Sequence, residues 1–418
     1  MSTLIQMERE VLRQAREWAR AELEKQMQAR ADQVEMVCAR SGQRLGNTRY
    51  RKMSVRTVAG LVRLRVRIGY SQGRCRWVNP LREAWGLEAY QRVSPELQAR
   101  VCKTATIAPS YESAVELARC WDCPLSDDLI HRHVQQMGTK VSSWGPLPAP
   151  PFNPARKFSL VIMMDGWMAR ERGPDWGASR RKKKKKKKTE RIAWHEIKSA
   201  VIYRLEQAVT TGKGRGLLLE KYIVATAPET SPVDFGEAVR AEAMRRGLGR
   251  AQRVYVVMDG AVWLWHLARD RFKEAVLILD FHHAREHLMA VGQALYGQDS
   301  VTVHRWVDPL IDQLQKGKER RVVRTLEQLL AKAPAMGSAQ QQVVEREVGY
   351  FQEHRDHLHY QRWKRSGAPC GSGAVESLGL QLQRRFRTCG QFWNRPGITN
   401  LMSLTVMFRN QDQKLLWN

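Results

Sequence analysis

The sequence is short of acidic residues and of long apolar runs. Asp and Glu number 42 against 70 Lys and Arg, which gives a formal net charge of +28 over 418 residues. Such an excess attracts polyanions and releases their counterions on binding, so nucleic acid is the expected partner. No run reaches the roughly 18 apolar residues of a membrane-spanning helix, and the first residues lack the basic and apolar order of a signal peptide. We therefore expect a cytoplasmic protein that has no membrane partner.

The seven cysteines are scattered and odd in number. In a cytoplasmic chain this favours free thiols over a disulfide framework. Cys120 and Cys123 have the spacing of a zinc knuckle, but no second Cys or His pair stands at a zinc-finger distance. Buried or turn thiols are therefore the prediction there. The chain is long enough for two or three domains, each with its own core.

What the sequence does contain is three short apolar runs that each end in an aspartate. They are Phe158 to Met164 before Asp165, Val254 to Met258 before Asp259, and Ala275 to Leu279 before Asp280. Each run predicts a strand buried on both faces, with its polar end at the sheet edge where open α/β sheets bind ligands. Gly166 and Gly260 follow the first two aspartates, and glycine there would let a bulky substrate approach the carboxylates.

A fourth candidate lies far downstream, where residues 371–377 read Gly-Ser-Gly-Ala-Val-Glu-Ser. This segment predicts a helix with Glu376 in its first turn. Asp165, Asp259 and Glu376 together could hold a pair of hard cations, which prefer carboxylate oxygens and assist phosphoryl transfer. A single acidic residue in a basic protein is usually a solvated group or a helix cap, but three in this order favour a metal-dependent polynucleotidyl transferase.

The first third of the chain predicts a mostly helical DNA-binding region. We expect one long helix within residues 1–52, over residues 6–37, that could pair with another chain. Residues 53–140 combine a strand pair turning at Gly60 with helices at 95–103, 110–118 and 126–137. The last two helices could form a helix-turn-helix, or equally a plain helical bundle. The recognition helix of the former would present His131, Arg132, His133 and Gln135, with Arg132 as the expected DNA contact.

Prolines at five positions between residues 141 and 156 predict a stiff linker. The expected elements after it are strands at 158–165, 194–205 and 221–226, then a helix at 232–247, a strand at 253–259, a helix at 262–271 and a strand at 275–280. Three strands followed by helix and strand alternation is the order of a ribonuclease H-like α/β fold, here a catalytic core over residues 157–283. Residues 284–365 predict a helical insertion, and residues 366–418 return to the core.

Two basic groups are candidate DNA contacts. Seven lysines follow Arg180 and Arg181 between the first two core strands: Lys182, Lys183, Lys184, Lys185, Lys186, Lys187 and Lys188. Their mutual repulsion predicts a solvated loop, which either contacts the DNA backbone or contacts nothing. Arg384, Arg385 and Arg387 lie near the end of the Glu376 helix, about 16 Å beyond the glutamate at roughly 1.5 Å per residue. They either bind a phosphate or only interact favourably with the negative C-terminal end of the helix dipole.

The motifs, taken in order, carry a family resemblance. They are Met164-Asp165-Gly166, Met258-Asp259-Gly260-Ala261 with Trp263, Leu279-Asp280-Phe281-His282-His283-Ala284 with Glu286-His287-Leu288, Gly371 to Ser377, Gly390-Gln391-Phe392-Trp393 and Trp417. Each motif is weak alone, but their order and spacing over residues 158–418 are specific. The chain resembles bacterial insertion-sequence transposases of the DDE, ribonuclease H-like superfamily, of the Kra-type group, and more distantly Mutator-like elements.

The resemblance implies that Asp165, Asp259 and Glu376 are the catalytic triad and bind two Mg²⁺ or Mn²⁺ ions. It implies that Asp280 and His283 support the site from outside the triad. The implied activity is cleavage at transposon ends and strand transfer into target DNA, by a homo-oligomer on DNA at the bacterial nucleoid. Relatives commonly have a cysteine pair after the N-terminal strands where this chain has only Cys75, so a zinc-supported module is not implied.

Three other functions match parts of the sequence. A ribonuclease H-like structure-selective nuclease would use the same carboxylates without joining strands. A non-catalytic DNA-binding protein derived from a transposase would keep the charge but would not need the carboxylates. His283, Glu286 and His287 spell the His-x-x-Glu-His signature of inverted zinc metallopeptidases, which leaves the Asp-Gly motifs and the charge unexplained. Another histidine group, at 354, 357 and 359, predicts a polar helix surface.

Overall fold

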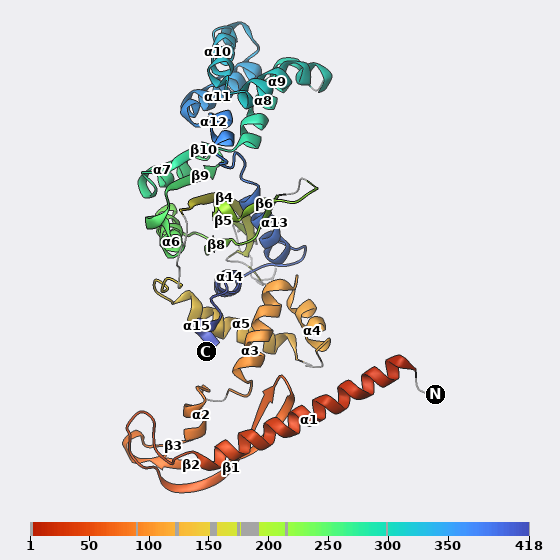
Figure 1. The fold of residues 1–418 in the computed structure, drawn as a ribbon, viewed down its shortest axis with the longest axis vertical. Helices are drawn as coiled ribbons and strands as arrows, with labels where there is room; N and C mark the ends of the chain where they lie inside the picture. Colours follow the sequence, from red (N-terminus) through yellow and green to blue (C-terminus); the bar gives the residue numbers. More distant parts are fainter. Residues whose placement is uncertain are drawn as a thin grey trace, which may run out of the picture. The chain divides into compact units, whose positions relative to one another are not determined.

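The computed structural model describes residues 3–88, 91–121, 125–150, 157–173, 176, 192–213, 216–297 and 300–417. The chain divides into two compact units, residues 1–137 with 412–418, and residues 138–411. Helices and sheets occur in both units (Figure 1), which confirms the expected α/β class. The Lys182 to Lys188 tract lies outside the described residues.

The first unit contains a three-stranded antiparallel sheet covered by a long helix. Valines and leucines on one face of the hairpin, such as Val62 and Leu64, are buried, and the partly buried Leu23 and Met27 of the helix pack against them. The strand pair is thus confirmed, but it begins earlier than residue 53. The first seven residues of its first strand are exposed on both faces, so no apolar alternation marks them in the sequence. The elements are α1 (Leu4–Gln33), β1 (Gly46–Thr57), β2 (Gly60–Ser71) and β3 (Arg76–Val78).

Helices make up the remainder of this unit, and they confirm the three helical stretches expected there. Ser94 and Ser110 accept hydrogen bonds from the first turns of their helices, which fixes where those helices start. The last residues of the chain join this unit through Trp417, whose Nε1 donates to Oε1 of Gln98 at 3.2 Å. The helices are α2 (Pro80–Ala84), α3 (Pro95–Ile107), α4 (Tyr111–Arg119), α5 (Asp127–Ser142) and α15 (Lys414–Trp417).

His133, one of the four residues that a recognition helix in α5 would carry, is not exposed to solvent. His133 is buried, and its Nδ1 lies 3.0 Å from Nε2 of Gln98 on α3. His133 therefore lies on the face that α5 packs against α3, and a recognition helix in α5 would not present it to DNA. His131 and Arg132 are exposed.

The second unit is centred on a five-stranded mixed sheet with the order β10-β9-β4-β5-β8. β4 pairs parallel with β9 and antiparallel with β5, while β9 pairs parallel with β10. Helices α6 (Pro232–Arg245) and α7 (Val262–Arg271) alternate with the later strands, as expected. A small ribbon, β6 (Ala208–Thr210) with β7 (Gly216–Leu218), was not expected. The main strands are β4 (Ser159–Arg172), β5 (Ile192–Arg204), β8 (Tyr222–Ala225), β9 (Arg253–Met258) and β10 (Val276–Leu279).

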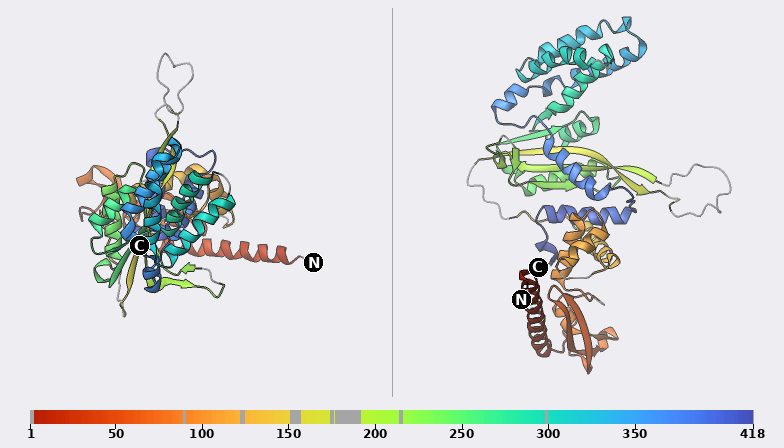
Figure 2. Two further views of the ribbon diagram at one scale, coloured as in Figure 1. Left: turned by 90° about the horizontal axis from the view of Figure 1, so that it is seen from above. Right: turned by 90° about the vertical axis from the view of Figure 1, so that its right-hand side faces the viewer.

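β4 continues well past Asp165, where the apolar run ends. Its pairing with β9 stops at Met164, but its pairing with β5 continues to Arg172. Asp165 therefore marks the end of the parallel pairing and not the end of the strand, which corrects the predicted boundary. Residues 166–172 escaped detection because buried and exposed side chains mix there. This outer ribbon extends beyond the rest of the sheet (Figure 2).

Five helices confirm the helical region expected between residues 284 and 365. Its first helix begins at Phe281, directly after β10 and Asp280. The helix expected at Glu376 also forms, and Val375, Leu378, Leu382 and Phe386 are buried along one stripe of it. The helices are α8 (Phe281–Tyr296), α9 (Ser300–Gln315), α10 (Glu319–Leu330), α11 (Ser338–Glu353), α12 (Tyr360–Arg365), α13 (Gly373–Phe386) and α14 (Arg395–Arg409).

Two expectations about the whole chain can be compared with the described residues. None of the helices among them is long and apolar enough to cross a membrane. Six of the seven cysteines are described, and all six are free thiols, as the odd and scattered set predicts.

Candidate active site

The three predicted catalytic residues converge at one edge of the sheet. Met164 is paired with Met258, so Asp165 and Asp259 follow side by side where the parallel pairing ends. Glu376 lies in the first turn of α13, which packs on β4 and β5. Burial raises the pKa of Asp165 to about 6, and the carboxylates of Asp259 and Glu376 add to the shift. The three acidic groups are therefore close enough to interact.

The backbone around the two aspartates fixes one oxygen of each carboxylate. Oδ1 of Asp165 accepts from the N–H of Gly166 at 2.7 Å, and Oδ1 of Asp259 accepts from that of Ala261 at 2.9 Å. The carbonyl of Asp259 also accepts from Nε1 of Trp265 at 2.8 Å. Side chains held in this way are pre-oriented before any ligand binds.

Asp280 is fully buried, and both of its oxygens accept hydrogen bonds from the backbone. Oδ1 accepts from the N–H of His283 at 2.8 Å and caps α8, while Oδ2 accepts from the N–H of Ser372. The hydroxyl of Ser372 donates to Oε1 of Glu376 at 2.6 Å. Asp280 thus orients Glu376 through Ser372, which is the geometry that a supporting residue needs.

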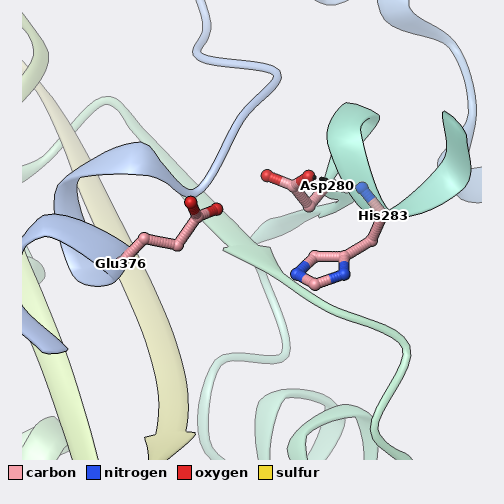
Figure 3. Close-up of side chains that lie close together, drawn as sticks. All are labelled: Asp280, His283 and Glu376. Carbon is pink, nitrogen blue, oxygen red and sulfur yellow. Dashed lines mark hydrogen bonds between the residues drawn. The ribbon is translucent and has the colours of Figure 1, made fainter. Parts of the chain in front are cut away.

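A second possible ligand set overlaps the first. The ligand atoms of Asp280, His283 and Glu376 lie within 4.8 Å of one another, and Figure 3 shows the three side chains turned toward a common space. An imidazole with two carboxylates suits a transition metal, whereas Mg²⁺ prefers oxygen ligands alone. Nδ1 of His283 also lies 3.3 Å from Oε2 of Glu286. Among the described residues this set of Asp280, His283 and Glu376 is the one group of possible ligands whose atoms lie so close together, and Asp165 and Asp259 lie outside it.

Other side chains of the protein lie against the two glycines that follow the aspartates. A Cβ on Gly166 would lie 2.3 Å from Oε1 of Glu196, and one on Gly260 would lie 2.0 Å from Cε2 of Tyr350. The ring of Tyr350 takes this space at Gly260. At Gly166 only the end of the flexible Glu196 side chain does, so close approach of a substrate to Asp165 stays a prediction. Tyr350 belongs to α11, so the helical insertion reaches the candidate site at Gly260.

Histidines of the insertion extend this contact. Tyr350 stacks on His287 at 3.6 Å between ring centroids, and Nδ1 of His287 bonds to Oε2 of Glu347. His287 is thereby directed toward α11. Among the described residues His283 groups with Asp280 and Glu376 and not with His287, so the zinc ligand pair of a metallopeptidase is not formed there.

His354 and His357 enclose the indole of Trp265, with ring centroids at 4.5 and 4.4 Å. The same indole donates to the carbonyl of Asp259. His354 is buried, which corrects the expected polar helix surface. The irregular spacing of these histidines reflects a turn between α11 and α12 and not one continuous helix face.

Protonation of His354 is expected to destabilise the fold. Burial lowers its pKa to about 4, and the neighbouring charges of His357, Arg269 and His287 lower it further. The unfolded histidine titrates near pH 6.5. The stability contributed by the neutral ring is therefore complete above pH 6.5 and is lost as the pH falls toward 4. Between pH 7.5 and 5 the loss should be about 2 kcal/mol.

Urea unfolding at the two pH values measures this loss. In His354→Phe the drop in stability on acidification should be about 2 kcal/mol smaller than in the wild type. His304→Phe is the control, because His304 is a partly exposed histidine of α9. Equal drops in all three proteins would contradict the prediction.

The structure separates the three arginines expected to contact DNA from α13. Arg384 and Arg387 are exposed, but Arg385 is buried, with its guanidinium 5.1 Å from the ring centroid of Trp393. The prediction for Arg385 is wrong because this residue follows Leu378 and Leu382 at i+7 and i+3 and so shares their buried stripe.

These observations define the class of the protein as a mixed α/β protein with a carboxylate cluster where the parallel pairing of its central strands ends. No protein-family model matches the chain. No curated protein matches it either.

Proposed function

We propose that this protein is a DNA transposase of the DDE type with a ribonuclease H-like core. The observation that carries the proposal is the convergence of Asp165, Asp259 and Glu376 at one edge of the mixed sheet. The chain order of three main strands followed by helix and strand alternation supports the core fold. The net charge of +28 supports DNA as the partner.

The three carboxylates would hold two Mg²⁺ or Mn²⁺ ions. The donor set fits hard cations, because it consists of oxygens only. Its like-charged carboxylates repel one another, and a bound cation would relieve that repulsion. Bound ions of this kind activate a hydroxyl nucleophile and stabilise the leaving oxygen of a phosphodiester. Trp265 holds the backbone of Asp259, and Asp280 with Ser372 holds Glu376, so these residues position the ligands.

The reaction would be two in-line phosphoryl transfers. Water first cleaves a strand at the transposon end and frees a 3′ hydroxyl, which then attacks a phosphodiester of the target DNA. Neither step needs a covalent bond to the protein. Exposed Arg132, Arg384 and Arg387 are the proposed phosphate contacts, and the tract of Lys182 to Lys188 remains a prediction from the sequence.

A homo-oligomer acting at the bacterial nucleoid is part of the proposal. Six large apolar side chains on the first half of α1 are exposed, and a second copy of the helix would cover them: Leu4, Ile5, Met7, Val11, Leu12 and Trp18. Burial of such a stripe between two helices is favourable.

A cleavage and joining assay tests the proposal. In Mg²⁺ the purified protein should cut a duplex that ends in the inverted repeats beside its gene and should join the freed 3′ ends to a plasmid. EDTA should abolish both products on a denaturing gel. Cleavage without joining would favour the structure-selective nuclease, and DNA binding without cleavage would favour the non-catalytic protein.

A further inference from the structure

The outer part of the β4 and β5 ribbon carries alternating guanidinium groups and aromatic rings. We name it the Arg-aromatic ladder, and its members in spatial order are Arg387, Trp194, Arg170, Phe392, Trp176 and Arg172. The Cζ atom of Arg170 lies 5.8 Å from the ring centroid of Trp194 and 5.3 Å from that of Phe392. Arg387 lies 5.1 Å from Trp194, Arg172 lies 5.4 Å from Trp176, and the rings of Trp176 and Phe392 are 4.7 Å apart.

Strand pairing places the ladder on one face. Arg170 is paired with Trp194 across the antiparallel ribbon, so both side chains project from the same side. On its other edge β4 bonds to the chain near Trp393, which brings Phe392 beside Arg170. Nη2 of Arg170 donates to the carbonyl of Thr388 at 2.8 Å, so this guanidinium is fixed in place.

The ladder combines exposed ring surface with positive charge. Trp194 is 48% exposed and Trp176 is 41% exposed, although burial of such rings is favourable. The ladder contains three arginines and no carboxylate. The nearby Glu171 is buried and bonded to Arg395 at 2.6 Å. A partner with planar rings and negative charge would therefore interact more favourably with the rings and guanidinium groups of the ladder than an apolar protein surface would.

We propose that the Arg-aromatic ladder is a stacking site for unpaired bases of a DNA strand leaving the active site. The inference rests on the proposed function. Bases would stack on Trp194 and Trp176, and phosphates would pair with Arg387 and Arg172. A paired duplex keeps its base faces covered, so the ladder prefers single strands.

The position of the ladder agrees with such a path. Arg170 follows Asp165 by five residues on β4, which is about 17 Å at roughly 3.3 Å per residue. A stacked strand covers that length with about five nucleotides at roughly 3.4 Å each. The site would thus hold bases about five nucleotides from the scissile bond.

Fluorescence anisotropy in EDTA tests the ladder without any need for cleavage. The full chain is titrated into a labelled thymidine 20-mer and into a duplex of the same length. Trp194→Ala and Trp176→Ala should each weaken binding of the single strand about tenfold and leave duplex binding within about twofold. Trp194→Phe keeps a ring and should retain most of the affinity.

Trp306→Ala is the control, because Trp306 is a half-buried tryptophan of α9 in the helical insertion, with its ring centroid 6.5 Å from that of Tyr296. It should bind the 20-mer like the wild type. The salt dependence gives a second readout. Trp194→Ala should leave the slope of log affinity against log salt unchanged, while Arg387→Gln should reduce it by about 0.7 for each lost phosphate contact.

Equal single-strand affinities of wild type, Trp194→Ala and Trp176→Ala would overturn the inference. If Trp194→Ala melts at a lower temperature, Trp176→Ala and Trp194→Phe decide the outcome. If the protein binds single strands through the ladder but never cuts DNA, the proposed transposase function is contradicted and the proposed stacking site is retained. A protein that cuts and joins DNA with unchanged binding in both tryptophan variants would contradict the ladder alone.

Discussion

Replacing Asp259 with Asn is expected to reduce strand cleavage about 1,000-fold or more, while DNA binding stays within about twofold. The carboxylate is a proposed metal ligand, and loss of a ligand removes several kcal/mol of transition-state stabilisation. It touches no proposed phosphate contact, so affinity is preserved. Asp165→Asn and Glu376→Gln should behave in the same way. Single-turnover cleavage in Mg²⁺ and anisotropy on the same DNA measure the two effects separately.

Asp280→Asn separates the two overlapping ligand sets. The amide nitrogen of Asn cannot accept from the N–H of Ser372, so Glu376 loses part of its support. The expected loss of cleavage is about 10- to 100-fold, as for other groups that orient a metal ligand. Asp270→Asn, an exposed acid on α7, is the control and should be fully active. If Asp280→Asn is as inactive as Asp259→Asn at an unchanged melting temperature, the metal is bound by Asp280, His283 and Glu376 instead.

Gly260→Ala is expected to destabilise the fold by about 1 to 3 kcal/mol and to impair cleavage. The new methyl group would meet the ring of Tyr350, and the strain falls on the backbone next to Asp259. In a Tyr350→Ala background the same alanine should cost little, because the obstructing ring is gone. Urea unfolding of the four proteins gives the coupling energy between the two positions.

Gly349→Ala is the matched control for this pair. Gly349 precedes Tyr350 on α11, and a Cβ there would meet nothing within 4 Å. The variant should be more stable by up to about 1 kcal/mol, since alanine is favoured over glycine inside a helix. The clash between residue 260 and Tyr350 would be contradicted if Gly260→Ala were as stable as the wild type. It would also be contradicted if this substitution lowered the free energy of unfolding equally with and without the Tyr350 ring.

The carboxylates could be predicted from the sequence because strands buried on both faces give continuous apolar runs with clear ends. Asp259 and Asp280 directly follow such strands. Glu376 could be placed in the first turn of a helix from residues 371–377 alone. Arg385 could also have been placed correctly, because it shares the apolar stripe of that helix.

Contacts between distant segments could not be predicted. Nothing near Gly260 in the sequence indicates Tyr350, and only the packing of α11 joins them. The Arg-aromatic ladder likewise needs β4, β5 and the chain near Phe392 to meet. The strand predicted at 194–205 includes Trp194, but the outer part of β4 was not predicted, because residues 168–172 form no apolar run. Ser372 had a signal in hindsight, since it precedes Glu376 by one helical turn.

Asp280 has a consequence for how the helical insertion is attached. The insertion leaves the core at Phe281 and returns at Cys370 and Ser372, and the N–H of Phe281 donates to the carbonyl of Cys370 at 2.8 Å. Asp280 accepts hydrogen bonds from both ends of the insertion, so the insertion is a loop that is closed at this one residue. The entropy of closing such a loop changes by only about 0.6 kcal/mol for each doubling of its length. The core can therefore accept a longer or shorter insertion at little entropic cost, provided that both of its ends still bond to Asp280.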